Sequence, residues 1–185
     1  MSNASQMASP FFSRYRSTFE AREPNLERQK HEDELTDVSG RDDVVSLTVA
    51  PIAGARCGTP PRKPRSSGDQ MHLWLVGTED VLVALEEGPS GKSTSRGRLA
   101  HTNLSGGRPA HAGGELWFRD EASLWLTGGS SRYPPRSKEE LDAIVEGFRS
   151  SGYNVCSCGW AEDIAAPARF FRGPEQWLEA HETAA

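Results

Sequence analysis

Residues 114–127 of the chain, GELWFRDEASLWLT, decide its fold. Two apolar runs flank a short Asp-Glu-Ala turn, which is the pattern of a β-hairpin. In the second run Leu124 and Leu126 point to the same face, because successive side chains of a strand alternate. The stretch therefore predicts antiparallel strands at 114–119 and 123–127, with one face turned toward a core.

The segment that follows at 137–150, SKEELDAIVEGFRS, has the pattern of an amphipathic helix. Ser137 and Glu140 have the spacing of a capping box, which satisfies backbone N–H groups of the first turn. Apolar residues then recur at intervals of three and four and form one stripe. These residues are Leu141, Ile144, Val145 and Phe148. Gly152 suits the C-terminal cap, so we predict a helix over 138–150.

Short apolar runs on both sides of this region predict the rest of a sheet. Residues 72–77 and 81–86, HLWLVG and VLVALE, form a second hairpin, and 153–158 is a returning strand. Residues 97–104 predict a weaker strand, and residues 44–52 also have the pattern of a strand. We expect the α+β class, with a mostly antiparallel sheet of about five to six short strands and one main helix packed on a face.

Composition divides the chain into three parts. Residues 1–70 are rich in Ser, Arg and Glu and end in a Pro/Gly/Arg-rich stretch, so we expect a disordered tail and linker. All five Trp lie after residue 73, and a single α+β domain is expected at 71–173. Residues 174–185 are expected to form a short C-terminal helix or tail.

The tail contains aromatic residues with partly helical spacing. These are Phe11, Phe12, Tyr15 and Phe19. Two interpretations are open. One is a disordered segment that carries an aromatic patch, and the other is a short helix by which the tail binds a partner.

Charge and apolar content restrict the possible functions. The net charge of −5 lies entirely after residue 70, because the tail holds ten basic and ten acidic residues. A net-negative domain is a poor binder of phosphate backbones, so no nucleic-acid partner is expected. No apolar run reaches the roughly 18–20 residues of a membrane span, and residues 1–12 lack the apolar core of a secretory signal. Three Cys make no disulfide framework. We expect a cytoplasmic location, or delivery by a non-classical secretion route.

Residues 88–94, GPSGKST, contain part of the pattern of a phosphate-binding loop. In a true loop a glycine stands at the position of Glu86, and backbone N–H groups and a helix N-terminus hold the phosphates. Here that position is a carboxylate, and the residues that follow, STSRGRLAH, do not predict a helix. We therefore favour a flexible hairpin loop.

Two groups of side chains bear on metal binding. Cys156 and Cys158 are separated by one residue, but structural zinc takes four ligands, usually from two such pairs, and no second pair exists. A pair of buried thiols on one face of a strand is the better interpretation. His101, His111 and Glu115 are close in sequence, but we expect ordinary loop residues there. No metal is predicted, and the sequence identifies no cofactor.

Two glycine-rich segments, 105–115 and 128–135, predict a binding cleft. Tight turns between strands would explain the glycines, but glycine also lets a backbone approach a ligand closely. The second segment leads into the predicted helix N-terminus, which attracts anions. The polar residues that adjoin the two segments are His101, Thr102, Arg108, Glu115, Ser130, Ser131, Arg132 and Tyr133.

The order of these motifs resembles a group of bacterial domains often found at the C-termini of toxin- or effector-like proteins. Their pattern is approximately Arg-His-Ser-Ser, Gly-x-Pro-Val, Ala-Gly-Glu and Ser-Gly-His-Tyr-x-Pro. The corresponding residues here lie in 99–107, 112–115 and 129–134, and the resemblance covers about residues 71–158. The resemblance supports the prediction of a folded domain here more than it supports any particular activity.

His101, Glu115 and Tyr133 match the pattern of that group, whereas other positions depart from it. Thr102-Asn103 replaces a Ser-Ser pair, and Ser131-Arg132 replaces Gly-His. If the missing histidine is a catalytic base, the chain is a divergent or inactive member.

The first functional hypothesis is a toxin- or effector-like transferase that acts on a nucleotide-type ligand in the cleft. His101 would bind substrate hydroxyl groups, Tyr133 would stack on a ring, and Glu115 would act as a base or stabilise positive charge. In residue types this set resembles the His-Tyr-Glu set of ADP-ribosyltransferases, although the order differs. The expected ligand-binding residues are Thr102, Arg108, Ser130, Ser131 and Arg132.

Two alternatives involve no chemistry. In one, the cleft binds a small molecule or a protein partner as a non-catalytic module. In the other, the domain is purely an interaction protein, with some of its Trp residues as surface anchors.

Overall fold

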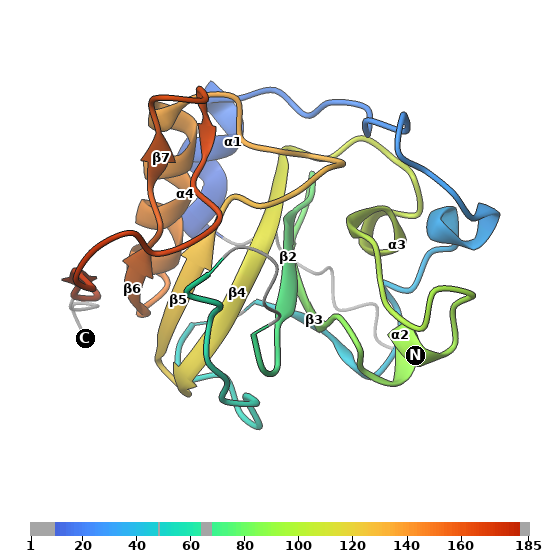
Figure 1. Cartoon of the computed structure of the whole chain (residues 1–185), viewed down its shortest axis with the longest axis horizontal. Coiled ribbons are helices and arrows are strands. Elements are labelled where there is room, and N and C mark those ends of the chain that lie inside the picture. Colours follow the sequence, from blue (N-terminus) through green and yellow to red (C-terminus); the bar gives the residue numbers. More distant parts are fainter. Residues whose placement is uncertain (1–9, 48, 64–67, 182–185) are drawn as a thin grey trace.

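The computed structural model of the protein describes residues 10–47, 49–63 and 68–181. The outermost parts of the predicted tail and C-terminal segment, and part of the predicted linker and first strand, lie outside the described residues. Within the described residues the fold is mixed α and β, with a mostly antiparallel main sheet and few helices (Figure 1).

The main sheet has seven strands among the described residues, more than the sequence predicts. In spatial order they are β1 (Val44–Ser46), β3 (Val81–Leu85), β2 (His72–Val76), β4 (Ala112–Asp120), β5 (Ser123–Thr127), β6 (Asn154–Ser157) and β9 (Trp177–Leu178). A small second sheet pairs β7 (Trp160–Ala161) with β8 (Ala166–Pro167). β1 lies within the strand predicted at 44–52 but has only three residues. β9 was not predicted as a strand, because its two residues are too few to show a period in the sequence.

Both predicted hairpins are confirmed. β2 pairs with β3, and β4 pairs with β5, each in antiparallel register. β6 pairs with β5 in parallel, because α4 (Lys138–Ser150) carries the chain back between them. The long middle strand β4 lies between β2 and β5 and is therefore the centre of the sheet.

Helix α4 confirms the prediction for residues 138–150. The Ser137 side chain accepts a hydrogen bond from the Glu140 backbone N–H at 3.1 Å, which is one half of the capping box. The Glu140 carboxylate accepts a hydrogen bond from the Arg136 N–H at 2.6 Å. The four apolar residues of the predicted stripe are all buried, so the stripe faces the sheet.

The two faces of the sheet are covered by different elements (Figure 1). On one face α4 packs with η1 (Pro10–Phe12) and α1 (Ser13–Thr18) over Trp74, Leu116 and Leu124. On the other face, α3 (His101–Ser105) packs over Leu73 and Leu75. The short helices η2 (Glu32–Leu35) and α2 (Pro89–Lys92) lie at the border of this second layer.

The described part of the predicted tail is packed against the domain, which differs from the expectation of disorder. We call residues 10–43 the leader. The side chains of Phe12 and Tyr15 are 0% and 3% exposed and belong to the core beneath α4. Further on, Arg22 and Ala110 exchange two backbone hydrogen bonds. Low apolar content suggested disorder, but a few aromatic anchors and many polar contacts to the body hold this segment in place.

Three local predictions need correction. Residues 97–104 are not a strand, because the chain enters α3 at His101 and ends it at Gly106 in the left-handed conformation. Residues 88–94 include the short helix α2 rather than only a loop. At the C-terminus, Trp177 and Leu178 form β9 rather than a helix, and they pair with β6.

The longest helix in the described ranges is α4, with 13 residues. None of the described helices has both the length and the apolar character needed to cross a bilayer.

Candidate functional site

Alternation along β4 places Glu115 on the α3 face of the sheet. Gly113 and Gly114 precede it, and each glycine makes room for a ring on its own face. A Cβ at position 113 would lie 2.7 Å from the His101 ring, and one at 114 would lie 2.5 Å from the Trp74 ring. The glycines of this segment thus serve close packing, while Glu115 projects between its strand neighbours Leu73 and Thr127.

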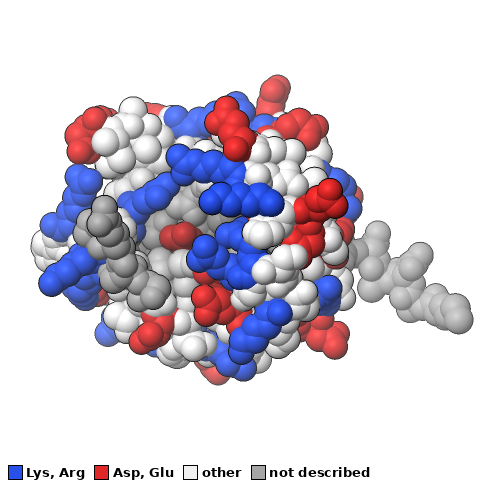
Figure 2. Space-filling model, turned by 45° about the vertical axis from the view of Figure 1, so that its right-hand side comes forward, with Lys and Arg blue, Asp and Glu red and all other residues white. Residues whose placement is uncertain are grey.

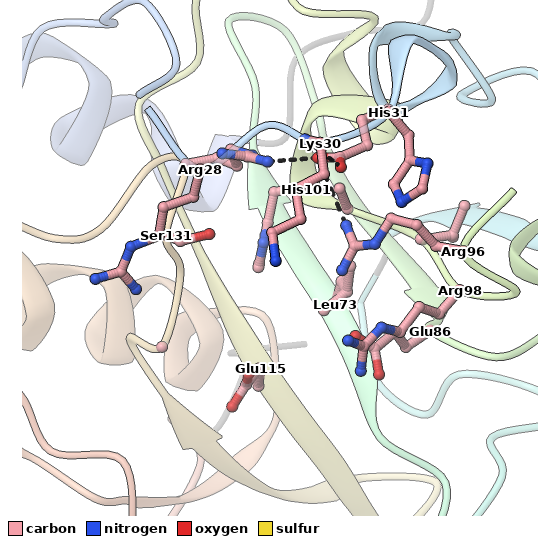
Figure 3. Close-up of a pocket in the computed structure, with 15 residues that line it drawn as sticks. Arg28, Lys30, His31, Leu73, Glu86, Arg96, Arg98, His101, Glu115 and Ser131 are labelled. Carbon is pink, nitrogen blue, oxygen red and sulfur yellow. Dashed lines mark hydrogen bonds and ion pairs between the residues drawn. The ribbon is translucent and has the colours of Figure 1, made fainter. Parts of the chain in front are cut away.

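Glu115 lies in a cavity of about 480 Å³, which we call the basic pocket. Its charged lining consists of Arg28, Lys30, Arg96, Arg98 and Arg132, with the carboxylates Glu34, Glu86 and Glu115. Figure 3 shows Glu115 projecting from β4, with Lys30 reaching in from the leader and Arg96 from the loop before α3. In Figure 2 this side of the molecule is hollowed, with blue Lys and Arg side chains around the hollow and red atoms within it.

A buried ion-pair cluster attaches the leader to this pocket. Glu34 is 2% exposed, and its carboxylate accepts hydrogen bonds from the Arg132 side chain and, at 3.2 Å, from the Lys30 backbone N–H. Arg96 forms an ion pair with Glu34 at 3.6 Å. Burial tends to raise the pKa of Glu34, but the hydrogen bonds and the two arginines outweigh it and hold the pKa below its usual value. Glu34 is therefore charged at neutral pH and fixes both arginines.

Asn103 makes a second attachment between the leader and α3. Its side-chain N–H₂ group donates to the backbone carbonyls of Asp33 at 2.7 Å and Thr36 at 3.0 Å. Its side-chain oxygen accepts from the Ala100 N–H at 2.9 Å. Asn103 is one of the departures from the toxin-associated pattern, and its role here is to hold η2 beside the helix.

Three cations of the pocket, Arg28, Lys30 and Arg98, form no ion pair with another described residue. Arg28 and Lys30 are exposed. Arg96 and Arg132, by contrast, already share Glu34. The charge available to a ligand at the mouth of the pocket is therefore positive and comes mainly from the leader.

Two of the three carboxyl groups of the pocket, Glu115 and Glu86, have raised pKa values, unlike Glu34. Burial raises the pKa of Glu115 to about 7, and the nearby charge of Glu86 adds to this rise, while Arg169 opposes it. Burial also raises the pKa of Glu86, against the effect of Arg98. With a pKa of about 7, the Glu115 carboxyl group is partly protonated near neutral pH. A carboxyl group in this state can both give and accept a proton.

His101 lines the same pocket but is tied to the backbone. Its Nε2–H donates to the Gly114 carbonyl at 2.9 Å, which fixes the neutral tautomer and leaves Nδ1 as an acceptor. Burial lowers the pKa of His101 to about 4, and the charge of Arg132 adds to the decrease, although the Gly114 hydrogen bond opposes it. His101 is therefore neutral at pH 7, and its ring forms a fixed polar part of the pocket lining.

Tyr133 is not among the described residues that line the basic pocket. Its ring is 0% exposed and belongs to the core beneath α3. The hydroxyl group donates to the Arg108 carbonyl at 2.8 Å and accepts from the Ser105 hydroxyl at 2.7 Å. The structure thus brings together two members of the predicted trio, His101 and Glu115, while the Tyr133 ring has no face free to stack on a ligand.

Of the five predicted ligand-binding residues, two line the basic pocket and three do not. Ser131 and Arg132 line the basic pocket. Ser130 accepts hydrogen bonds from the backbone N–H groups of Arg132 and Tyr133, and so shapes the turn. Thr102 is buried, and Arg108 lies at the surface in an ion pair with Asp37.

Sequence analysis missed most of the cations and two of the three carboxylates of the basic pocket. The sequence does not indicate Arg28, Lys30 and Glu34 as site residues, because the composition of the leader predicts disorder. Glu86 was considered only as the residue that disqualifies a phosphate loop. The one available signal was its position directly after a strongly apolar strand, where polar side chains at strand ends gather around clefts.

A second pocket of about 620 Å³ adjoins the first and shares Glu86, Arg98 and Glu115 with it. It lies toward the opposite end of β4 from α3, where Arg169 and Phe170 form part of its wall. Glu115 therefore stands where two depressions meet.

In the described part of the chain, no three His, Cys, Asp or Glu side chains lie close enough together to hold a metal ion. Cys156 is buried and Cys158 is partly buried, and both thiols are free. Burial raises the pKa of both thiols, so they are protonated and unreactive at neutral pH.

No protein-family model, curated protein or solved structure matches the chain. The resemblance to toxin- and effector-associated domains therefore stays a prediction.

Proposed function

We propose that this protein is an enzyme of the transferase type that acts on a phosphate-bearing, nucleotide-type ligand in the basic pocket. Glu115 is its acid–base group. The observation that carries the proposal is a carboxyl group with a pKa of about 7 at the base of a cavity whose rim is cationic. Strongly shifted pKa values beside a charge partner in a cleft are typical of functional sites.

The cationic rim would bind the phosphates. Arg28 and Lys30 offer charge that no described carboxylate neutralises, and Arg96 and Arg132 are held in fixed positions by Glu34. Preorganised arginines bind phosphate oxygens through paired N–H groups. The local positive field reconciles anion binding with the acidic character of the whole chain, because exposed charges act only over about 8–10 Å at physiological salt.

The test of acid–base chemistry is Glu115→Gln, which keeps the shape of the side chain and removes its titration. Turnover is measured for a panel of nucleotides, including NAD⁺ and ATP, by separating products. We expect turnover to fall by about 100-fold or more, while nucleotide binding is retained. Glu121→Gln is the matched control, because Glu121 is exposed in the β4–β5 turn. Equal turnover in wild type and Glu115→Gln would contradict the proposal.

The test of anion binding is the double substitution Arg28→Gln with Lys30→Gln. We expect the Kd for ADP to rise about tenfold at low salt and less at high salt, because the lost interactions are exposed and screened. The control pair Arg14→Gln with Arg136→Gln changes the net charge equally at exposed positions outside the pocket. If both pairs weaken binding equally, the leader does not form the site.

A non-catalytic binding module is the second candidate. It is favoured by the loss of Tyr133 from the predicted trio and by the backbone hydrogen bond that occupies His101. This candidate predicts that nucleotides raise the Tm of the wild-type protein while none in the panel is turned over.

A further inference from the structure

The two pockets that meet at Glu115 differ in charge. In the basic pocket, cationic side chains outnumber carboxylates. In the second pocket the two are equal in number: Arg56, Lys92, Arg98 and Arg169 face Asp69, Glu86, Glu87 and Glu115. The second pocket therefore has a smaller excess of cationic side chains than the basic pocket and attracts a phosphate less strongly.

The second pocket instead offers apolar surface at its wall. Phe170 and Met71 are half-buried there, and Leu85 and Pro61 also line it. An aromatic side chain beside polar groups in a cavity of this size suits a planar ring that carries hydrogen-bonding edges, because bases stack on aromatic rings.

We propose that the second pocket binds the base of a nucleoside phosphate whose phosphate groups occupy the basic pocket. The ring lies against Phe170, and the sugar passes beside Glu115, where the two pockets meet. This inference rests on the proposed function and narrows its ligand class, since a ligand without a ring would fill only the basic pocket.

The experiment compares ADP with inorganic pyrophosphate, which carries the charge but has no ring. Binding of each to the full chain is measured by titration calorimetry for wild type, Phe170→Ala and Phe170→Trp. We expect Phe170→Ala to raise the Kd for ADP about tenfold, the size of one lost stacking contact, and to leave the Kd for pyrophosphate unchanged. Phe170→Trp should retain ADP binding.

Phe171→Ala is the matched control, because the neighbouring Phe171 is also partly buried but is not among the described residues that line either pocket. It should change neither Kd. If Phe170→Ala leaves the Kd for ADP unchanged, or weakens ADP and pyrophosphate equally, the ring subsite is wrong while the basic pocket stands. If wild type binds neither compound, the proposed function itself fails.

Discussion

The two faces of the main sheet are built from the same strands but have opposite character. The α4 face is a continuous apolar core that includes Trp74, Leu116 and Phe148. The α3 face also has an apolar cluster, which includes Leu73, Leu75 and Leu82, but beside it the face opens into a pocket with buried and partly buried carboxyl groups. The first face holds the fold together, and the second keeps charged groups out of water at a cost in stability.

Strand β4 shows how one stretch of sequence builds both faces. Gly114 and Leu116 face α4, whereas Gly113 and Glu115 face α3, because side chains alternate. A shift of one residue in register would place Glu115 in the apolar core. The difference between the faces therefore depends on register, which the long pairing of β4 with β2 and β5 fixes.

The largest expected effect lies on the α4 face, at Glu140. Its buried carboxylate accepts from the Tyr15 hydroxyl at 2.9 Å and from Arg22 at 3.1 Å. Glu140→Ala leaves these donors without their acceptor, so we expect a loss of about 3–5 kcal/mol in the free energy of unfolding, measured in urea. Glu139→Ala, an exposed neighbour in the same turn, should cost far less. Similar losses for the two variants would show that the leader is not anchored there.

The next effect lies on the α3 face and depends on pH. Burial raises the pKa of Glu115 to about 7, whereas in the unfolded chain a glutamate titrates near 4.3. Between these values the folded state holds a proton that the unfolded state has released, so stability falls as the pH rises through this window. The decrease is complete above about pH 7 and is on the order of 3 kcal/mol.

Glu115→Gln should remove this pH dependence. The variant and the wild type should have equal stability near pH 4, and the variant should be the more stable near pH 8, as measured by urea unfolding across that range. Glu121→Gln should show no such divergence. A constant difference between wild type and Glu115→Gln at every pH would mean that the carboxyl is not buried in the folded protein.

The smallest effect returns to the α4 face, at Gly147. Alanine normally stabilises a helix interior relative to glycine, but here a Cβ would lie 2.5 Å from the Phe12 ring. We expect Gly147→Ala to destabilise the protein by about 1–3 kcal/mol, because the core is overpacked. Thermal and urea unfolding would measure it. The double variant with Phe12→Leu should recover part of the loss, whereas strict additivity would show that the two residues do not touch.

Local patterns predicted the elements whose signals lie within one stretch of sequence. The stripe of α4 and the alternation of β4 and β5 needed only nearby residues. Helix α3 was missed because Leu99 and Leu104 suggest a strand, although Gly106, with a φ of +61°, is a C-terminal cap that could have indicated a helix. Strand β9 was missed because its two residues form a strand only through pairing with the distant β6.

The candidate site was predicted only in part, again because some of its contacts join residues that are far apart in the sequence. His101 and Glu115 adjoin glycines that the sequence displays. The leader's contribution depends on Glu34 meeting Arg132, 98 residues away. Nothing in the composition of the leader distinguishes such a docked segment from a disordered one, because its anchors are few and its contacts are polar.

The distant anchoring of the leader has a consequence for synthesis. Tyr15 precedes its partner Glu140 by 125 residues, so the N-terminal aromatic side chains leave the ribosome long before α4 exists. They cannot reach their packing positions until residue 140 has emerged, and closing so long a loop is slow. A chaperone that binds exposed aromatic residues therefore has its longest opportunity at this end of the nascent chain.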